Sequence, residues 1–295
     1  MKSFAEKQVQ IDSHRSHMMT HYPDMWARIL SEWRSSGMGD RAWLMFCANY
    51  LMRTGNVHWA LDPLRLHQWL PEEAKMDVAR DLRDLSFVLL THEHDDHLDL
   101  GLIHLLRDLP IRWVVPQAIL SLVVDKAGLS LAKIIVPEMM VPLKIEGIII
   151  LPFDGMHWQV TTPSEKGSDF TGRRGVPSTS YVVEFSGKRW LFPGDVRTYD
   201  ATALRPLGRI DGVFAHLWLG RGSALISPPP LLDAFCRFCI ETGAQRVVLA
   251  HLEEFGRDAN DYWDADHVVQ VVSHFRRIAP GLPVTAAYMG ESIEL

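Results

Sequence analysis

Cysteine is scarce in this chain, with three residues among 295. Three cysteines cannot build the disulfide framework that stabilises small secreted domains. Long apolar runs are also missing: none approaches the roughly 18 residues that cross a bilayer, and the N-terminus lacks the apolar stretch of a secretory signal. The sequence therefore predicts a protein without a membrane span in a reducing, cytoplasmic setting, and none of the three cysteines stands among the candidate ligands described below.

Positive charge is limited as well. Lysine and arginine total 30 against 36 aspartate and glutamate residues, which gives a net charge of −6. This composition lacks the basic footprint of a nucleic-acid-binding protein, although it does not exclude a phosphorylated small molecule. An apolar fraction of 47% suffices for a large core, and no repeat or long linker divides the chain. We expect a single domain over residues 1–295, with residues 1–40 as an N-terminal helical extension and a homo-oligomer as an open alternative.

Hydrophobic periodicity predicts alternating helices and strands of an α/β protein. The predicted helices are 24–34, 71–82, 100–107, 117–127, 231–242 and 265–278. The predicted strands are 42–51, 57–61, 87–90, 112–115, 133–136, 141–145, 148–151, 157–161, 180–185, 189–192, 212–215, 246–250 and 283–287. Cys236 and Cys239 fall inside a predicted helix without a preceding redox strand, so we expect two small buried residues rather than a redox pair.

A dense cluster of polar side chains follows the apolar run at 87–90. Residues 91–97 read Thr-His-Glu-His-Asp-Asp-His. The pattern H-x-H-x-D-H places three imidazoles and the carboxylate of Asp96 within six residues, directly after a predicted strand. A solvated, histidine-rich loop is the simpler alternative, but it gives no reason to gather these groups there. A divalent metal does, because neutral imidazole and carboxylate are ligands that Zn²⁺, Fe²⁺ and Mn²⁺ accept. The cluster therefore predicts metal binding.

Four further segments repeat the pattern of an apolar run that leads to a potential ligand. The run at 57–61 leads to Asp62, and the run at 148–151 leads to His157. The run at 190–192 leads through Gly194, whose missing side chain permits a sharp turn, to Asp195. The run at 247–250 leads to His251.

This ordered series resembles the metallo-β-lactamase superfamily over about residues 41–290. The resemblance implies a four-layer αββα sandwich with two divalent ions. It places His92, His94 and His157 on the first ion. It places Asp96, His97 and His251 on the second ion, with Asp195 bridging both. Asp62 would orient the ligand loop instead of binding an ion itself.

Within that superfamily the chain is most similar to the L-ascorbate-6-phosphate lactonase-like branch. The similarity lies in the triplet His97-Leu98-Asp99 and in the tail 251–256. Two features depart from the pattern: Val196 follows Asp195 where many members carry threonine, and the segment 216–222 matches no consensus of the family. Both departures concern the substrate more than the metal site.

The ligand set implies hydrolysis by a metal-bound hydroxide. Two divalent ions about 3.5–4 Å apart share a water and lower its pKa towards 7. Asp195 would fix the ion spacing, and Asp96 would accept a hydrogen bond from the nucleophile and later help to protonate the leaving group. We expect a small, anionic ester, lactone, amide or phosphoester as substrate and Zn²⁺ as the first choice of ion, before Mn²⁺ or Fe²⁺. The alternatives are a phosphodiesterase or nuclease of the same fold, or a non-catalytic metal-binding module.

Residues that would select the substrate are expected on loops around the ions. The polar, glycine-rich segment 162–175 contains Arg173 and Arg174, whose guanidinium groups would grip a phosphate or carboxylate, although a plain surface loop explains the segment equally well. His216 and Arg221 follow the predicted strand 212–215 and would reach the same rim. For His216 a structural role is favoured over direct catalysis.

Two weaker candidates, Arg197 and Tyr199, lie just beyond Asp195.

Overall fold

The computed structural model describes residues 3–35, 37, 39–74, 76–157, 159, 160 and 173–295. Two seven-stranded sheets form its centre. The first sheet has the strand order β16 (Ser292–Glu294), β1 (Arg41–Leu44), β2 (Tyr50–Thr54), β3 (Val57–Leu61), β4 (Phe87–Leu89), β5 (Arg112–Val114) and β6 (Ile134–Ile135). The second has the order β15 (Val284–Ala286), β14 (Val247–Ala250), β13 (Gly212–His216), β12 (Lys188–Phe192), β11 (Thr179–Phe185), β8 (Ile148–Asp154) and β7 (Leu143–Ile145). A short ribbon pairs β9 (Gln159–Val160) with β10 (Arg173–Arg174).

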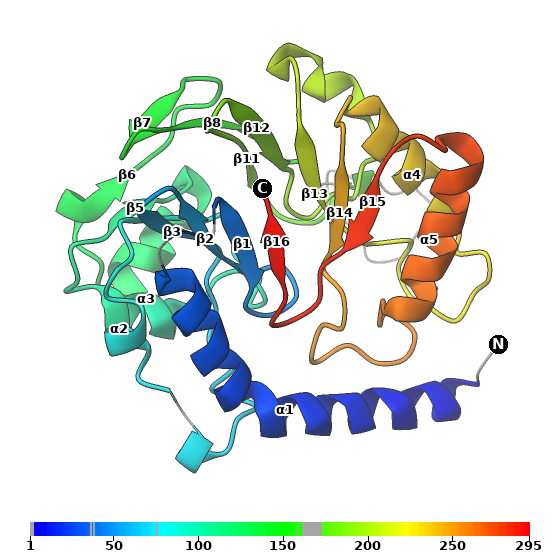
Figure 1. Ribbon diagram of the computed structural model, residues 1–295, viewed down its shortest axis with the longest axis horizontal. Helices are drawn as coiled ribbons and strands as arrows, with labels where there is room; N and C mark the ends of the chain where they lie inside the picture. The colour runs from blue at the N-terminus through cyan, green and yellow to red at the C-terminus, as the bar shows by residue number, and fades with distance from the viewer. Residues whose placement is uncertain (1–2, 36, 38, 75, 158, 161–172) are drawn as a thin grey trace.

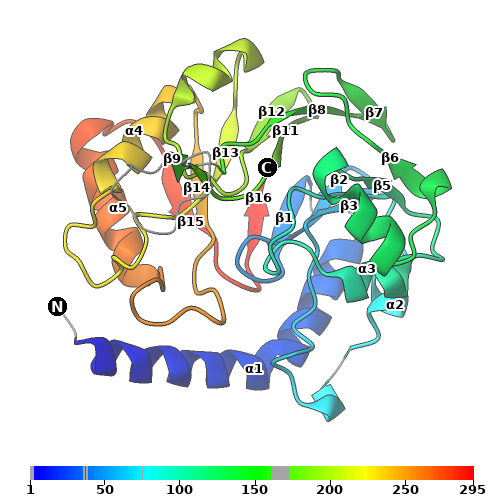
Figure 2. The same cartoon turned by 180° about the vertical axis from the view of Figure 1, so that it is seen from behind.

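Helices cover the outer faces of both sheets (Figures 1 and 2). The α-helices are α1 (Phe4–Arg34), α2 (Val78–Asp81), α3 (Leu100–Leu106), α4 (Leu232–Glu241) and α5 (Ala265–Ile278). Shorter helical turns are η1 (Glu72–Ala74), η2 (Gln117–Ile119), the π-turn η3 (Leu122–Lys126), η4 (Leu131–Lys133) and η5 (Ala201–Leu207). No helix in the described ranges is long and apolar enough to cross a membrane.

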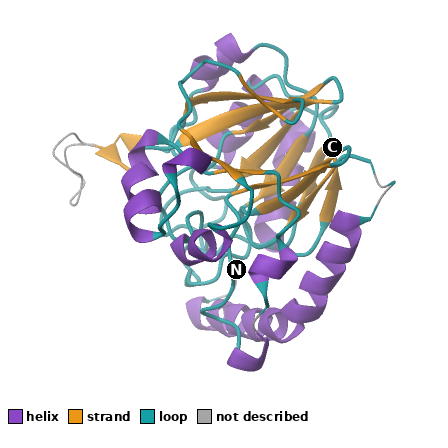
Figure 3. Ribbon diagram, turned by 90° about the vertical axis from the view of Figure 1, so that its left-hand side faces the viewer, coloured by secondary structure: helices purple, strands orange, loops and turns teal. Residues whose placement is uncertain are grey.

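Successive side chains of the strands pack alternately between the two sheets and under the helices. In β4, Phe87 and Leu89 pack between the two sheets, whereas Val88 packs under α1, α2 and α3. In β12, Phe192 packs between the sheets and Leu191 packs against α4 and α5. Because successive side chains of a strand point to opposite faces, apolar residues at every position require a covering layer on both sides. The predicted four-layer αββα sandwich is confirmed, and Figure 3 shows the strands between helices.

The helix α1 is much longer than the predicted 24–34. Pro23 lies inside the helix, where it removes a single backbone donor. Ser3 and Glu6 form a capping box that starts the helix about five turns before the proline. The indole of Trp33 donates to the carbonyl of Met52 at 2.9 Å. At the other end Lys7 pairs with the buried Asp264, so α1 extends from the first sheet to the start of α5 (Figure 1).

Three other predicted elements were wrong in their bounds. The predicted strand 42–51 is a hairpin, because the chain reverses at 45–49, where the amide of Met45 bonds to the carbonyl of Asn49 at 2.8 Å. Its apolar turn residues have the composition of a strand interior, which concealed the reversal. The predicted helices 71–82 and 117–127 are each broken into short turns, η1 with α2 and η2 with η3. The strands β10 and β16 and the turn η5 were not predicted. The single-domain organisation stays a prediction.

Candidate metal centre

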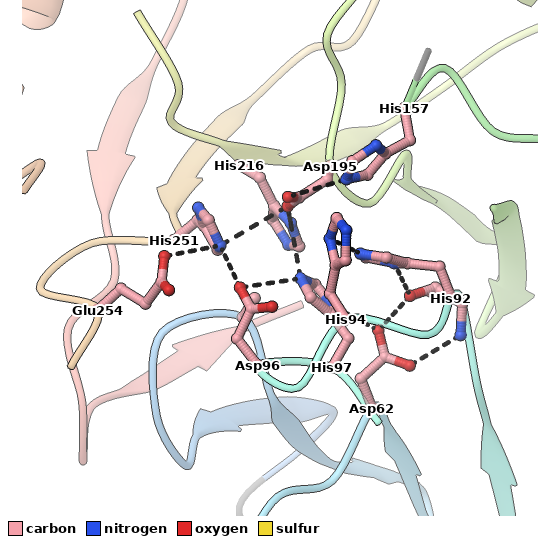
Figure 4. Close-up of polar contacts among 12 residues, drawn as sticks. Asp62, His92, His94, Asp96, His97, His157, Asp195, His216, His251 and Glu254 are labelled. Atoms are coloured by element: carbon pink, nitrogen blue, oxygen red, sulfur yellow. Dashed lines mark hydrogen bonds and ion pairs between the residues drawn. The ribbon is translucent and has the colours of Figure 1, made fainter. Parts of the chain in front are cut away.

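The polar loops gather at one edge of the sandwich because of strand direction. β3 and β4 run parallel, as do β12, β13 and β14. β8 points the same way as β12, since both pair antiparallel with β11. The carboxyl ends of these strands therefore lie together, and the loops after them carry the side chains in Figure 4.

The first group of side chains comes from three loops. Ligand atoms of His92, His94, His157 and Asp195 all lie within 4.8 Å of one another. Nε2 of His92 is 3.2 Å from Nδ1 of His94. Nε2 of His157 is 3.6 Å from Oδ2 of Asp195. These are the residues that the sequence assigned to the first ion, together with the expected bridge.

The second group meets the opposite oxygen of the same aspartate. Oδ1 of Asp195 is 3.4 Å from Nε2 of His97 and 3.7 Å from Nε2 of His251. Oδ2 of Asp96 is 3.1 Å from Nε2 of His251 and 3.8 Å from Nε2 of His97. Asp195 thus lies between the two groups, with one oxygen towards each (Figure 4).

Asp62 is fully buried beneath the ligand loop. Its carboxylate accepts hydrogen bonds from the backbone amide of Thr91 at 2.8 Å, from the hydroxyl of Thr91 at 2.5 Å and from Nδ1 of His97 at 2.8 Å. The Thr91 hydroxyl in turn accepts from Nδ1 of His92 at 2.9 Å. This network assigns the ring protons to Nδ1, so that Nε2 of both histidines presents a lone pair to the centre. Asp62 therefore lies where it contacts His97 directly and His92 through Thr91, and its orienting role stays a prediction.

His216 ends β13 and supports Asp195 from behind. Its Nδ1 donates to Oδ1 of Asp195 at 3.1 Å, and its Nε2 accepts from the hydroxyl of Tyr50 at 3.1 Å. Burial lowers the pKa of His216 to about 4, against the opposing charge of Asp195. A neutral imidazole with both nitrogens occupied by protein groups fits the structural role that the sequence favoured.

Charges in the centre suit a cation. Burial, with the charge of His97, lowers the pKa of His92 well below its usual range, so its imidazole is neutral. Burial opposes ionisation of Asp195, but His251 and Arg197 outweigh it and hold the pKa of that carboxyl well below its usual range. Burial also opposes a charge on His97, yet Asp96, Asp195 and Asp62 raise its pKa well above the ordinary value. The carboxylates therefore favour a positive charge at Nε2 of His97, as a proton or as a metal ion.

Two buried nitrogens provide a direct test of whether metal fits. Within the described part of the chain, Nε2 of His97 and Nε2 of His157 have no hydrogen-bond partner. A buried polar atom without a partner is costly, and each of these faces a different oxygen of Asp195. A metal ion on each side of that carboxylate would satisfy both. The donor set of imidazole and carboxylate fits divalent ions of the zinc, iron and manganese type.

A cavity of about 340 Å³ opens above the centre. Its lining includes His94, His157 and His251 from the two groups and three arginines, Arg197, Arg221 and Arg257. Arg197 donates to Oδ2 of Asp195 at 2.8 Å and lies over the ring of Trp218 at 4.6 Å. Arg257 pairs with Glu254 at 2.7 Å.

Arg221 differs from the other two arginines of the cavity. It is exposed, and in the ranges that the structure describes its guanidinium has no ion-pair partner. Tyr199, the other candidate beyond Asp195, points away from the centre, with its hydroxyl bonded to the carbonyl of Trp218. Arg173 and Arg174 form β10, but their side chains and most of the segment 162–175 lie outside what the structure describes.

The sequence reasoning missed two residues that the fold brings to the second group. Glu254 lies 3.7 Å from Nε2 of His251, three residues further along the loop after β14. Cys47 lies with Asp96 and His251, with its sulfur and their ligand atoms all within 4.8 Å of one another. Cys47 was not among the predicted ligands.

Comparison with solved structures shows the fold. A possible metal-dependent hydrolase from Veillonella parvula superposes with a TM-score of 0.63 at 16% identity, covering 88% of this chain and 100% of that one. An isothiocyanate hydrolase from Delia radicum gut bacteria has a TM-score of 0.58 at 16% identity, covering 86% and 98%. CmlA, a diiron β-hydroxylase from Streptomyces venezuelae, has a TM-score of 0.59 at 14% identity, covering 88% of this chain and 55% of its own.

No curated protein matches the sequence. The family described as the beta-lactamase superfamily domain matches residues 61–252. This match covers more than half of the chain and runs from the end of β3 to just past His251. It therefore contains every residue that the sequence assigned to the two ions. With the layered fold, it shows that the chain belongs to the metallo-β-lactamase superfamily.

Proposed function

We propose that the protein is a dinuclear metal-dependent hydrolase of a small anionic ester, lactone or phosphoester. His92, His94 and His157 would hold the first ion. Asp96, His97 and His251 would hold the second, and Asp195 would bridge them. The observation that carries the proposal is the pair of buried, unpartnered nitrogens, Nε2 of His97 and Nε2 of His157, on opposite sides of one carboxylate. A single ion would satisfy one of them only.

The chemistry follows from the residues around the cavity. Two divalent ions, when bound, would lower the pKa of a shared water and polarise the attacked group. Asp96 lines the cavity while its Oδ2 contacts His251, so its carboxylate can take the proton of the attacking water and return it to the leaving oxygen. His216 and Arg197 keep Asp195 in place through one oxygen each.

Charge and size support a small, anionic substrate. Two divalent ions would bring more positive charge than the carboxylates of Asp96 and Asp195 neutralise, and Arg221 adds a cation at the rim that has no ion-pair partner among the described residues. A cavity of about 340 Å³ is at the lower end of the range for small-molecule sites. The acidic net charge speaks against the phosphodiesterase or nuclease alternative, because nucleic acid binding needs a basic surface. The lactonase-like branch remains the preferred relative among the small-substrate enzymes.

The first test is elemental analysis of protein purified without chelator or added metal. About two equivalents of zinc, iron or manganese per chain are expected. One equivalent would contradict the dinuclear site, and no metal even after reconstitution would contradict the ligand assignment itself.

The second test screens the metal-loaded protein against matched pairs of lactones, esters and phosphodiesters, one member anionic and the other neutral. Faster turnover of the anionic members is expected. Turnover of none, by a protein that holds two ions, would favour the non-catalytic metal-binding module.

A further inference from the structure

The turn between β1 and β2 is built into the metal centre. Its residues 45–49 are all buried, with exposures of 1% or less. The side-chain amide of Asn49 donates to the carbonyl of Asp62 at 2.7 Å and to the carbonyl of Asp96 at 2.9 Å. The turn therefore holds the backbone of both the orienting aspartate and a ligand aspartate, although it is far from them in sequence.

Cys47 occupies the part of this turn nearest to the second group. Its carbonyl accepts a hydrogen bond from the backbone amide of His251 at 2.7 Å, at a point where His251 has a φ of 62°. Its sulfur, a carboxylate oxygen of Asp96 and a ring nitrogen of His251 all lie within 4.8 Å of one another. This backbone hydrogen bond thus holds Cys47 and His251 next to each other.

These separations approach those of ligands on one ion. Zn–S bonds of about 2.3 Å and Zn–N bonds of about 2.0 Å at tetrahedral angles place sulfur and nitrogen about 3.5 Å apart. A rotation of the cysteine side chain about χ1 moves the sulfur further than the remaining difference. Nε2 of His251 contacts Oδ2 of Asp96 at 3.1 Å, and its Nδ1 is buried and, within the described residues, has no hydrogen-bond partner, so the protein group that this ring contacts is the carboxylate that would share the ion.

We propose that Cys47 is a thiolate ligand of the second ion, beside Asp96, His97 and His251. This inference rests on the proposed metal centre and adds a soft donor to a set of imidazoles and carboxylates. On binding, the thiol releases its proton to solvent and the sulfur takes the cation in its place. A thiolate favours zinc or iron over manganese, so the second position would discriminate between these ions while the first, without sulfur, would not.

The simplest competing account treats Cys47 as a small buried residue. Cys236 and Cys239 are cysteines of that kind, because both are buried in α4 among the apolar side chains that pack α4 and α5 against the second sheet. Neither belongs to a group of potential metal ligands in the described part of the chain. The double variant C236S/C239S is therefore a matched control that keeps Cys47 as the single thiol.

The test is absorption spectroscopy of the full chain loaded with Co²⁺. Cobalt bound to thiolate gives an intense charge-transfer band in the near ultraviolet, whereas nitrogen and oxygen ligands give weak visible bands only. We expect the charge-transfer band in the natural protein and in C236S/C239S and its loss in Cys47→Ser. We also expect Cys47→Ser to bind one of its two ions at least about tenfold more weakly and the other unchanged.

The outcomes separate this inference from the function on which it rests. Two cobalt equivalents with visible bands but no charge-transfer band in the natural protein would overturn the thiolate ligand and leave the dinuclear centre standing. A band that survives Cys47→Ser would overturn it as well. If the natural protein binds no cobalt, the metal centre itself is refuted. The spectrum of the natural protein decides the matter even if Cys47→Ser fails to fold.

Discussion

Asp62 connects both groups of the centre through its hydrogen bonds, so its charge bears on both ions. It accepts from Nδ1 of His97 directly and from Nδ1 of His92 through the hydroxyl of Thr91. In Asp62→Asn the new amide nitrogen donates where the carboxylate accepted. The Thr91 hydroxyl then donates to His92, and the ring protons of both histidines move to Nε2. Nitrogens that carry a proton cannot bind a metal ion.

The expected effect is a loss of affinity for both ions. Changes in groups that orient a ligand histidine cost about 10- to 100-fold in metal affinity, which equals about 1.4 to 2.7 kcal/mol per ion. Burial raises the pKa of the Asp62 carboxyl, and the bonds from His97 and Thr91 offset part of that rise. The asparagine has the same shape, so the fold should survive the change.

Thr91→Val separates the two arms of the network. It removes the relay to His92 but leaves the bond between Asp62 and His97, so it should weaken the first ion alone. Asp81→Asn is the control for loss of a buried carboxylate away from the centre, since Asp81 accepts from the indole of Trp26 under α1. It should leave both affinities unchanged.

Competition against a chromophoric chelator resolves the two binding steps. Unchanged affinities in Asp62→Asn would refute the tautomer argument. An equal loss at both sites in Thr91→Val would refute the separation of the two arms.

Four further changes test other parts of the structure. Asp195→Ala should lower turnover at least about a hundredfold and reduce the bound metal below two equivalents, with an unchanged circular dichroism spectrum; full activity would exclude the bridge. Arg221→Ala should raise KM about tenfold or more for an anionic substrate and leave that of a neutral analogue unchanged, and equal effects on both would exclude anion recognition. Asp264→Ala removes the buried partner of Lys7 and leaves it with Asp266, whose carboxylate is 60% exposed, and should cost about 3–5 kcal/mol in urea unfolding, whereas Asp266→Ala, which keeps the buried pair, should cost less than about 1 kcal/mol. Removal of metal by chelator should lower stability by about 2.7 to 4.1 kcal/mol for each ion present at 100 to 1,000 times its Kd, and a melting temperature that does not respond to chelator would show that the loops are fixed without ions.

The layers, and the grouping of the main polar side chains of the centre, could be predicted because each rests on a local pattern. A strand buried on both faces appears as an uninterrupted apolar run, and a polar group directly after such a run lies at the sheet edge. Asp62, His157, Asp195 and His251 each follow a run of this kind, and the structure brings all four to one edge. Because these strands run in the same direction, their carboxyl ends meet at one edge of the sheets. This meeting follows from the order of the elements alone.

The turn at 45–49 could not be predicted because it lacks the local pattern of a turn. Loops ordinarily lie at the surface and carry polar residues, whereas this one is buried and apolar except for Asn49. Its polar groups bond to partners outside the turn: the Asn49 side-chain amide donates to the carbonyls of Asp62 and Asp96, and the Cys47 carbonyl accepts from the amide of His251. Cys47 therefore appeared as one more residue of a strand. Arg257, which lines the cavity through its pair with Glu254, lacked a local signal in the same way.

At two positions of the centre, the backbone conformation indicates that the chemistry of the side chain determines which residue type occurs there. Asp62 has a φ of 46° and His251 a φ of 62°, in the left-handed region that costs an ordinary residue about 1–2 kcal/mol. Glycine would adopt these angles freely, and the chain does use Gly194, at a φ of 64°, just before Asp195. At Asp62 and His251, however, the residue that makes the turn is also the residue that must contact the centre. One residue has both roles because the strand leads directly into it. The strained backbone is kept in place by hydrogen bonds from the amide of Asp62 to the carbonyl of Leu89 and from the amide of His251 to the carbonyl of Cys47. A glycine one residue earlier could make the turn instead, as at Asp195, so the left-handed positions mark where a strand leads directly into a side chain of the centre.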